Sequence, residues 1–406
     1  MLCCSPHDKQ HQRVVLLIIV VMIIVVGSVG SFVLVGPVAR TARTARTSSV
    51  QPRALPAVDV VDVVMAFAMN YPPPMFYRFL ASLRAYDRDS LVVLFVSPKE
   101  KNSPPIQKLA TWFNATLVVA TYATYHELWA QVLGDPSESS AFFTKTNTAG
   151  YRFGYQWAWL ASYRSATSLR YVFLTDFRDV VFQDHLFRKI KPAFEMWLKH
   201  PRQPSTFYPS HPEWPTRQSN ADMDRCAEQV VAGGPQAPLL IAFPEGKRST
   251  LGKCKYNRDW LGNVYGFGLA DRWANRHVIC AGTVLGNVGG ITHWLVRMIE
   301  EIETFARTGR YNSNDQGIHN YLIHGDHLLS NVTVFLQNNE FGDLVTTMAQ
   351  VTFSRENIVG WIEPELNPDH RAAVIHQGDR LPEYWKGVER KYEMYLSTPR
   401  RHYRPP

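Results

Sequence analysis

Two patterns of hydrophobic and polar positions alternate along the first half of the chain: continuous apolar runs and apolar residues at helical spacing. Residues 58–69, 91–96 and 115–121 are largely apolar and rich in valine and leucine, which predicts buried strands. Residues 75–86 instead carry apolar side chains at helical spacing after a proline-rich stop, which predicts a helix. Strand–helix–strand repetition of this kind predicts an α/β domain with a mostly parallel central sheet and flanking helices.

The same patterns return later in the chain. The pattern predicts a helix over residues 151–162, a buried strand over 171–174, a strand over 278–286 that contains small residues, and a helix over 291–305. A small residue within a strand allows close approach of a ligand or another strand. Residues 200–278 show no such order. Prolines, aromatic residues and glycine-rich stretches predict either a pocket-shaping loop region or an insertion with no readable pattern.

Two carboxylates follow the buried strand over residues 171–174. Asp176 and Asp179 stand where the strand ends, and Val-Val-Phe then returns the chain to apolar packing. Two acids there repel each other unless a cation lies between them, and a divalent metal carrying a phosphate supplies that charge. The alternative is a salt-bridge cluster or an ordinary aspartate-rich turn, because Arg178 lies between the acids.

Further polar residues are predicted near the same edge. Asn70 and Tyr71 follow the first strand, and ligands of parallel sheets gather at the carboxyl ends of strands. Arg152 begins a helix and would meet a phosphate, pair with an acid or remain solvated. Asp315 stands beside an amide at a predicted helix start, where capping is the default role. His376 ends a short strand, where a structural role is the alternative to ligation.

The N-terminal segment has the composition of a membrane anchor. Residues 14–36 form 23 residues without a charge, and at about 1.5 Å per residue they would span a bilayer. A buried core helix is the alternative. Residues 1–13 are then a short tail, and residues 37–56, with three Ala-Arg-Thr repeats, a flexible stem.

The positive charge is concentrated in that segment. The net charge is +8, and residues 1–56 hold six basic residues against one acidic residue. The remainder is therefore only mildly basic, which argues against a nucleic-acid-binding surface. Arginines after residue 36 favour a cytoplasmic C-terminal part, whereas the sequons at Asn114 and Asn331 favour a lumenal one.

Several of these pieces occur together and in order, and the series resembles a group of single-anchor GT-A-fold glycosyltransferases. In that group the acid motif reads Asp-x-Arg-Asp followed by Val-Phe-Gln. The matching pieces are Arg152-Phe153, Leu174-Thr-Asp-Phe-Arg-Asp-Val-Val-Phe-Gln183, Ile279-Cys-Ala-Gly-Thr283, Asp315-Gln-Gly-Ile-His-Asn-Tyr-Leu322 and Ile375-His-Gln-Gly-Asp-Arg380. The usual GT-A motif is Asp-x-Asp, so the spacing here supports Asp179 as a ligand better than Asp176.

The resemblance implies a metal and a donor. Asp315-Gln316 also resembles glycogenin and bacterial galactosyltransferases, in which a C-terminal histidine completes the metal shell. By that resemblance Asp176, Asp179 and His376 hold Mn²⁺ or Mg²⁺, which bridges the diphosphate of a nucleotide sugar, expected to be a UDP-sugar. Asn70, Tyr71 and Arg152 would line the donor site, and Asp315, Gln316 and Arg178 would take part in catalysis. Retention of configuration is favoured over inversion.

The resemblance also implies a cellular setting. It favours a type II Golgi membrane protein with a lumenal catalytic domain over residues 57–385 and a glycan or glycoprotein acceptor. Residues 200–278 would form the acceptor side, and residues 386–406 a partly disordered basic tail. Cys3 and Cys4 would be cytoplasmic candidates for palmitoylation. Three lumenal cysteines allow one bridge, expected between Cys254 and Cys280 rather than Cys226.

Two other classes of function remain open at this point. The Asp-x-x-Asp spacing would also fit a membrane-tethered glycan-binding protein or scaffold that keeps the GT-A fold without catalysis. A metal-dependent phosphodiesterase or hydrolase would need more histidine and aspartate ligands for a two-metal site than the sequence supplies.

Overall fold

The structure is a computed structural model, and it divides the chain into two units, Met1–Ala57 and Val58–Pro406. It describes residues 60–121, 148–163, 168–199, 207–208, 220–233, 237–245, 249–308, 315–325, 328, 332–337, 344–348 and 372–397. The predicted tail, anchor and stem (residues 1–13, 14–36 and 37–56) lie outside these ranges. Within them, no helix combines the length and apolar character that crossing a membrane requires.

The first half of the folded unit matches the predicted α/β repeat closely. Its elements, in chain order, are β1 (Val60–Phe67), α2 (Pro73–Arg84), β2 (Leu91–Val96), α3 (Pro98–Lys101), α4 (Pro104–Trp112), β3 (Ala115–Val119), α7 (Thr148–Tyr163) and β4 (Ser168–Thr175). Strand β1 pairs in parallel with β2 and β4, and β2 pairs in parallel with β3. The valine-rich runs therefore form parallel strands, which confirms the prediction from the sequence.

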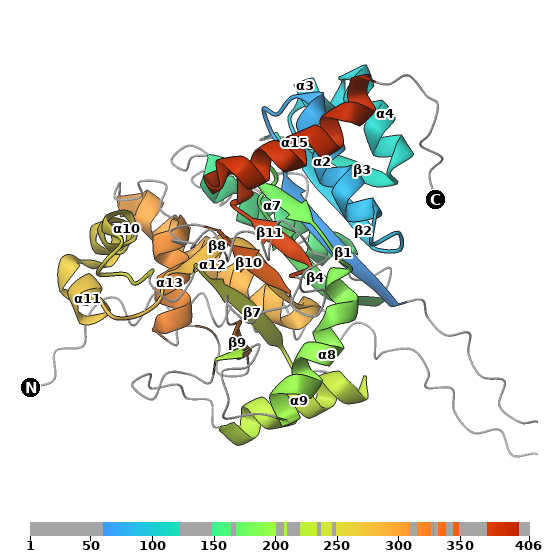
Figure 1. Cartoon of the computed structure of the whole chain (residues 1–406). Coiled ribbons are helices and arrows are strands. Elements are labelled where there is room, and N and C mark those ends of the chain that lie inside the picture. Colours follow the sequence, from blue (N-terminus) through green and yellow to red (C-terminus); the bar gives the residue numbers. More distant parts are fainter. Residues whose placement is uncertain are drawn as a thin grey trace, which may run out of the picture. The chain divides into compact units, whose positions relative to one another are not determined.

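The second half completes an eight-stranded sheet in the order β3-β2-β1-β4-β8-β7-β9-β6 (Figure 1). The added strands are β8 (Ile279–Asn287), β7 (Leu239–Pro244), β9 (Thr333–Gln337) and β6 (Phe207–Tyr208). Strand β8 runs antiparallel to both β4 and β7, whereas β7 and β9 are parallel. The sheet is thus mixed but mostly parallel, as predicted.

The prediction of an irregular region over residues 200–278 was wrong in part. This region contains α9 (Asn220–Ala232), β7, α10 (Lys255–Tyr265) and α11 (Phe267–Arg272). All six residues of β7 are buried, and the strand lies between β8 and β9 inside the sheet. Its run of six is short and flanked by proline and glycine, so periodicity alone does not separate it from a loop.

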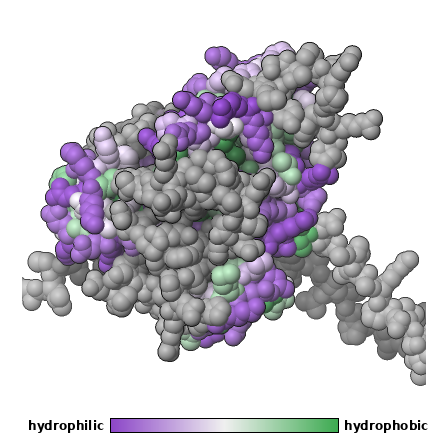
Figure 2. Space-filling model, viewed as in Figure 1, coloured by the Kyte–Doolittle hydropathy of each residue, from purple (hydrophilic) through white to green (hydrophobic). Residues whose placement is uncertain are grey.

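Helices cover both faces of the sheet. Along β1, Val64 and Ala66 pack into the cluster that includes α2, α4, α8 (Leu186–Lys199) and α9, while Val63 and Met65 pack into the cluster with α7, α12 (Val288–Thr308) and α13 (Asp315–His324). This alternation follows from the two-residue period of a strand. On the face drawn in Figure 2, the described surface is mainly hydrophilic, with small and separate hydrophobic areas.

A second, three-stranded sheet joins distant parts of the chain. Strand β11 (Val374–His376) pairs in parallel with β10 (Val345–Thr347) and antiparallel with β5 (Val180–Phe182). The apolar Val-Val-Phe run after the two acids is therefore a buried strand. Its register places His376 opposite Val180, the residue that follows Asp179. This pairing determines where the site forms.

The C-terminal segment is more ordered than predicted. Helix α15 (Pro382–Ser397) follows a short 3₁₀ helix, η2 (Gly378–Arg380), and Val388 and Tyr392 are buried in the same cluster as α2. The Trp385 ring lies 4.3 Å from the guanidinium carbon of Arg78 on α2. The expectation of a partly disordered tail was therefore wrong for residues 386–397, because aromatic side chains at helical spacing dock this helix onto α2.

The predicted disulfide between Cys254 and Cys280 is also wrong. Cys226, Cys254 and Cys280 are all buried, and none of the three forms a disulfide. The Cys254 sulfur accepts a hydrogen bond from Asn257 Nδ2 at 3.1 Å, whereas Cys280 lies beside His376. These two thiols therefore contact different elements of the fold.

Candidate metal centre

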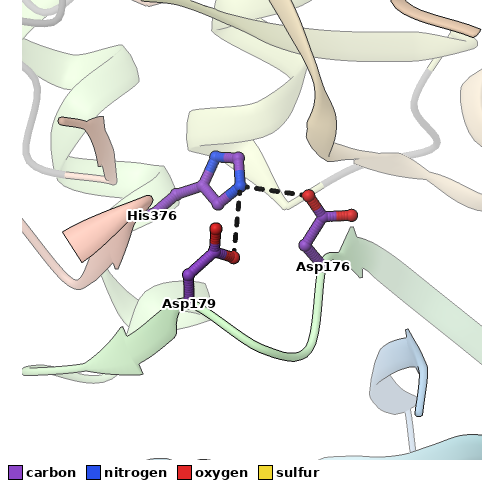
Figure 3. Close-up of side chains that lie close together, drawn as sticks. All are labelled: Asp176, Asp179 and His376. Carbon is purple, nitrogen blue, oxygen red and sulfur yellow. Dashed lines mark hydrogen bonds and ion pairs between the residues drawn. The ribbon is translucent and has the colours of Figure 1, made fainter. Parts of the chain in front are cut away.

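Asp176, Asp179 and His376 converge at the carboxyl end of β4 (Figure 3). One ligand atom from each residue can be chosen so that all three lie within 4.8 Å of one another. His376 Nε2 is 3.2 Å from Asp176 Oδ2 and 3.8 Å from Asp179 Oδ1. Two carboxylates and one imidazole nitrogen thus face the same point, and this group could hold a metal ion.

The antiparallel pairing of β4 with β8 positions Asp176. The backbone N–H of Asp176 donates to the carbonyl oxygen of Gly282 at 2.6 Å, which extends the ladder one residue past β4. A Cβ atom built on Gly282 would overlap Asp176 Oδ2 and lie 2.6 Å from His376 Cε1. Only glycine leaves room at this position for both side chains. The small residues of this strand predicted that another group approaches it closely. At Gly282 the side chains of Asp176 and His376 do so.

The three-stranded sheet positions the other two ligands. Asp179 immediately precedes β5, and His376 ends β11, which pairs with β5. The Gly378 N–H donates to the Asp179 carbonyl oxygen at 3.2 Å, and Gln377 takes a left-handed conformation with φ 55°. The chain therefore turns directly after His376 and closes around Asp179.

Cys280 on β8 orients the imidazole of His376. Its Sγ lies 3.4 Å from His376 Nδ1, so that the opposite ring nitrogen, Nε2, faces the two aspartates. Both residues are almost completely buried. A partner at one ring nitrogen is the usual means of directing the other toward a metal. Cys280 was not predicted as a site residue, although it lies in the Ile-Cys-Ala-Gly-Thr piece.

The cluster has the electrostatics of a cation site. Burial raises the pKa of Asp176, but Arg152 and His376 outweigh it and hold that pKa at about 2. Burial, together with Asp176 and Asp379, raises the pKa of Asp179 despite the opposing effect of His376. Burial lowers the pKa of His376, yet Cys280, Asp176 and Asp179 raise it well above its usual value. The imidazolium thus partly balances the two acids.

Two arginines also contact the acids, as the salt-bridge alternative requires. Arg152 lies 2.7 Å from Asp176 Oδ1 and 2.6 Å from Asp315 Oδ2. Arg178, about half exposed, lies 3.2 Å from Asp179 and 3.3 Å from Asp379. Each arginine is thus shared between two carboxylates. Arg380 Nε also lies 3.8 Å from Asp379, so three guanidinium groups and the His376 imidazolium face the four acids. The ion pairs of the alternative are therefore present. They leave Asp176 Oδ2 and Asp179 Oδ1 directed at His376 Nε2, where a metal could replace the imidazolium proton.

The first turn of α13 adds Asp315 and Gln316 to this edge. The Gln316 N–H donates to Asp315 Oδ1 at 2.8 Å, and Asn320 bonds to both the N–H and the carbonyl oxygen of Ile279, which holds α13 against β8. The Gln316 side chain donates to Glu245 Oε1 at 2.8 Å and to Asn257 Oδ1 at 2.7 Å. Burial raises the pKa of Asp315 against the effect of Arg152.

Sequence reasoning missed Glu245 and Asn257. Glu245 follows β7 and is 3% exposed, and Asn257 lies on α10 with the same exposure. Both belong to the region in which the sequence pattern predicted no regular elements. An acid directly after the apolar run Leu239–Pro244 was the available signal, since it repeats the arrangement of β4 and Asp176.

Asn70 and Tyr71 have different positions relative to the cluster. The Tyr71 ring lies 5.5 Å from that of Phe177, and burial raises the Tyr71 pKa, with Arg178, Asp176 and Asp179 close enough to influence it. Asn70 is exposed with a left-handed backbone at φ 64°. No hydrogen bond among the described residues joins its side chain to the cluster. The structure thus brings Tyr71, but not Asn70, toward the acids.

Comparisons with known proteins give distant likenesses only. No family model matches the chain, and no curated protein is similar to it. Among solved structures, a galactosyltransferase, LgtC, in complex with donor and acceptor sugar analogues is 15% identical with a TM-score of 0.40, covering 84% of this chain and 98% of its own. Mouse xyloside xylosyltransferase 1 is 10% identical with a TM-score of 0.39, covering 78% of this chain and 97% of its own. At these values the two likenesses carry no argument about activity.

Proposed function

We propose that this protein is a metal-dependent glycosyltransferase of GT-A type that transfers a sugar from a nucleotide sugar, a UDP-sugar, to a glycan or glycoprotein. One observation supports this most strongly. Asp176 and His376, 200 positions apart, and Asp179 each bring one possible ligand atom to a common point. The resemblance of the acid motif to single-anchor glycosyltransferases supplies the substrate class.

The residues present fit a divalent ion. Asp176, Asp179 and His376 would hold it, and a mixed oxygen and imidazole donor set suits Mn²⁺ at least as well as Mg²⁺. Gly282 keeps the space beside two of these ligands clear of a side chain. When bound, the ion would neutralise charge on the diphosphate leaving group.

The other polar residues would orient the substrates. Arg152 holds Asp176 and Asp315 with its two terminal nitrogens, so it couples the proposed metal ligand to the start of α13. Arg178 lies at the exposed rim, where it would meet the diphosphate, and Tyr71 lies near it. Asp315 and Gln316 would lie beside the transferred sugar or the acceptor hydroxyl, and we favour retention of configuration.

The cellular setting is part of the same proposal. Residues 14–36 would anchor the chain in the Golgi membrane, with the folded unit in the lumen. Asn114 in the first sequon is exposed, which a glycosylation site requires. Expression in secretory cells should give a chain whose mass falls on treatment with an N-glycosidase, and Asn114→Gln should remove part of that shift. A chain that carries no glycan and is released from membranes by alkali would contradict this setting.

The test of the activity is a turnover screen. The full-length chain should release nucleoside diphosphate from at least one UDP-sugar when Mn²⁺ is present and not in excess EDTA. Asp179→Asn should lower this turnover by about 1,000-fold or more while leaving the unfolding temperature nearly unchanged. Turnover that survives either EDTA or this substitution would contradict the proposal.

A second candidate is a glycan-binding or scaffold protein that keeps the fold without catalysis. The Asp-x-x-Asp spacing and the ion pairs of Asp176 and Asp179 with arginines favour it. Calorimetric titration with UDP separates the two, because a degenerate site would show no metal-dependent affinity.

A further inference from the structure

Gln316 donates both protons of its side-chain amide to buried acceptors. Its Nε2 lies 2.8 Å from Glu245 Oε1 and 2.7 Å from Asn257 Oδ1. Glu245 and Asn257 are each 3% exposed, while Gln316 is partly exposed. A primary amide has two donor protons and one acceptor oxygen, so both donors of Gln316 are in use.

The partners themselves are held in one orientation. Asn257 Nδ2 donates to Cys254 Sγ at 3.1 Å, which leaves Asn257 Oδ1 as the acceptor facing Gln316. Ser249 Oγ donates to the second oxygen of Glu245 at 3.4 Å. Burial raises the pKa of Glu245, but the hydrogen bonds from Gln316 and Ser249 oppose this shift and favour the carboxylate. A reversed Gln316 amide would need a donor at each partner. The Glu245 carboxylate has none, and Asn257 could donate only by losing its bond to Cys254.

This arrangement determines which end of the Gln316 amide is available. Among the described residues no donor forms a hydrogen bond with Gln316 Oε1. Gln316 directly follows Asp315, and the Asp315 carboxylate is paired with Arg152. A carbonyl oxygen accepts hydrogen bonds and cannot bind a phosphate oxygen. Its complementary ligand is a hydrogen-bond donor, and the hydroxyl groups of a sugar are donors of this kind.

We propose that Glu245 and Asn257 are positioning residues that fix the amide of Gln316 so that its carbonyl oxygen alone is presented to a sugar hydroxyl. The identity of the ligand as a sugar rests on the proposed function. The orientation itself does not, because it follows from the hydrogen bonds within the chain. Ordering the amide before the sugar binds would remove an entropic cost at the moment of binding.

The first test reads the amide directly and needs no turnover. The full-length chain is labelled with ¹⁵N at glutamine side chains, and the Gln316 resonance pair is identified by its absence in Gln316→Ala. Both Gln316 protons should exchange with water at least about tenfold more slowly than those of exposed glutamines. Glu245→Ala and Asn257→Ala should each abolish this protection for the proton that loses its acceptor. Exchange at the rate of exposed glutamines in the wild-type chain would overturn the proposal.

The second test separates positioning from general damage to the fold. With the UDP-sugar that the screen identifies, Glu245→Ala should lower kcat about tenfold and leave UDP affinity in Mn²⁺ within about twofold. In a Gln316→Ala background it should have no further effect, because its influence passes through that amide. An equal loss in that background would overturn the proposal.

A conservative variant provides a control for the case in which Glu245→Ala does not fold. Glu245→Gln keeps an oxygen that can accept from Gln316 and an amide that can bond to Ser249, so it should keep most of the turnover and the slow exchange. If Glu245→Ala does not fold, Glu245→Gln and Asn257→Ala decide the matter by exchange alone. Absence of wild-type turnover would contradict the proposed function, and the exchange rates would then decide the orientation of the amide by themselves.

Discussion

An aspartate–arginine pair lies at each end of strand β4, and the two pairs differ; the aspartate at its start, Asp62, belongs to the neighbouring strand β1. At the start of the strand, Arg170 Nε and Nη2 donate to the two oxygens of Asp62 at 2.9 and 2.6 Å. The Tyr171 N–H adds a bond to Asp62 at 3.3 Å. At the other end, Asp176 accepts from Arg152 with one oxygen and faces His376 with the other, and Asp179 lies beside them.

The difference separates a structural ion pair from a site. Asp62 has one guanidinium in a two-bond geometry, so its charge and its oxygens are satisfied. Asp176 shares its arginine with Asp315, and its second oxygen points at a histidine that a second acid also approaches. Two carboxylate oxygens and one imidazole nitrogen around a common point are the ligands that a bound cation would use.

Removal of the histidine should have the largest effect on metal binding. His376→Ala removes one of three ligands, so Mn²⁺ affinity of the full-length chain, measured by calorimetry, should fall by about 100-fold or more. The matched control is His185→Ala, because His185 also lies near an acid, 3.8 Å from Asp87, away from the cluster. Its affinity should stay within about twofold of wild type. An equal loss of Mn²⁺ affinity in the two variants would show that His376 is not a metal ligand.

Filling the space beside the cluster should have the next largest effect. Gly282→Ala would push a methyl group into Asp176 and His376, so Mn²⁺ affinity should fall by about 10- to 100-fold. Gly268→Ala is the control, since a Cβ there meets no atom within 4 Å. Calorimetric titration of both variants checks this. Unchanged affinity in Gly282→Ala would show that Asp176 and His376 do not bind the metal together.

Lowering the pH should reduce the Mn²⁺ affinity by a smaller factor. The pKa of His376 is raised well above its usual value in the metal-free chain, so metal must displace a proton near neutral pH. Mn²⁺ affinity should therefore fall by about tenfold when pH is lowered from 7 to 6, with proton release visible in buffers of different ionisation enthalpy. The metal-free chain should show the opposite trend in stability. The contribution of His376 is complete below about pH 6.5 and is lost as pH rises through the raised pKa. Affinity independent of pH would exclude His376 as a ligand.

The pair at the start of β4 should affect stability alone. Asp62→Ala removes the bidentate partner of Arg170 and an acceptor of the buried Tyr171 N–H, so the free energy of unfolding in urea should fall by about 1–3 kcal/mol. Arg170→Ala should cost about 1 kcal/mol or less, because the Arg170 side chain is 49% exposed and the pair is screened by solvent. Mn²⁺ affinity should stay unchanged in both variants. A loss of affinity would remove the distinction between the two ends of the strand.

Much of the sheet could be predicted from the sequence because its strands bury continuous apolar runs. Strand β2 has the predicted bounds, and β1, β3 and α2 differ from theirs by a few residues. Strand β7 could not be recognised in the same way, because six apolar residues between proline- and glycine-rich stretches fit a loop as well as a strand. Helix α15 was missed because its basic residues suggested a solvated tail, whereas Val388 and Tyr392 dock it.

The candidate site was partly predictable for a related reason. Asp176 and Asp179 are close in sequence, so their position after a buried strand was enough to draw attention to them. His376 was noted as the end of a short strand, but its place beside the two aspartates came only from the family resemblance, because the pairing of β11 with β5 is not visible in local periodicity. Glu245 had a local signal, its position directly after the apolar run Leu239–Pro244. Asn257 and Cys280 act through contacts between distant segments, which no local pattern indicates.

The most direct measurement of the central claim is a calorimetric titration of UDP into the full-length chain, once with Mn²⁺ and once with excess EDTA. We expect saturable binding with Mn²⁺ and a loss of at least about 100-fold in affinity with EDTA. Equal affinity under both conditions, or no binding under either, would contradict the assignment of Asp176, Asp179 and His376 as the ligands of a metal that binds a nucleotide diphosphate.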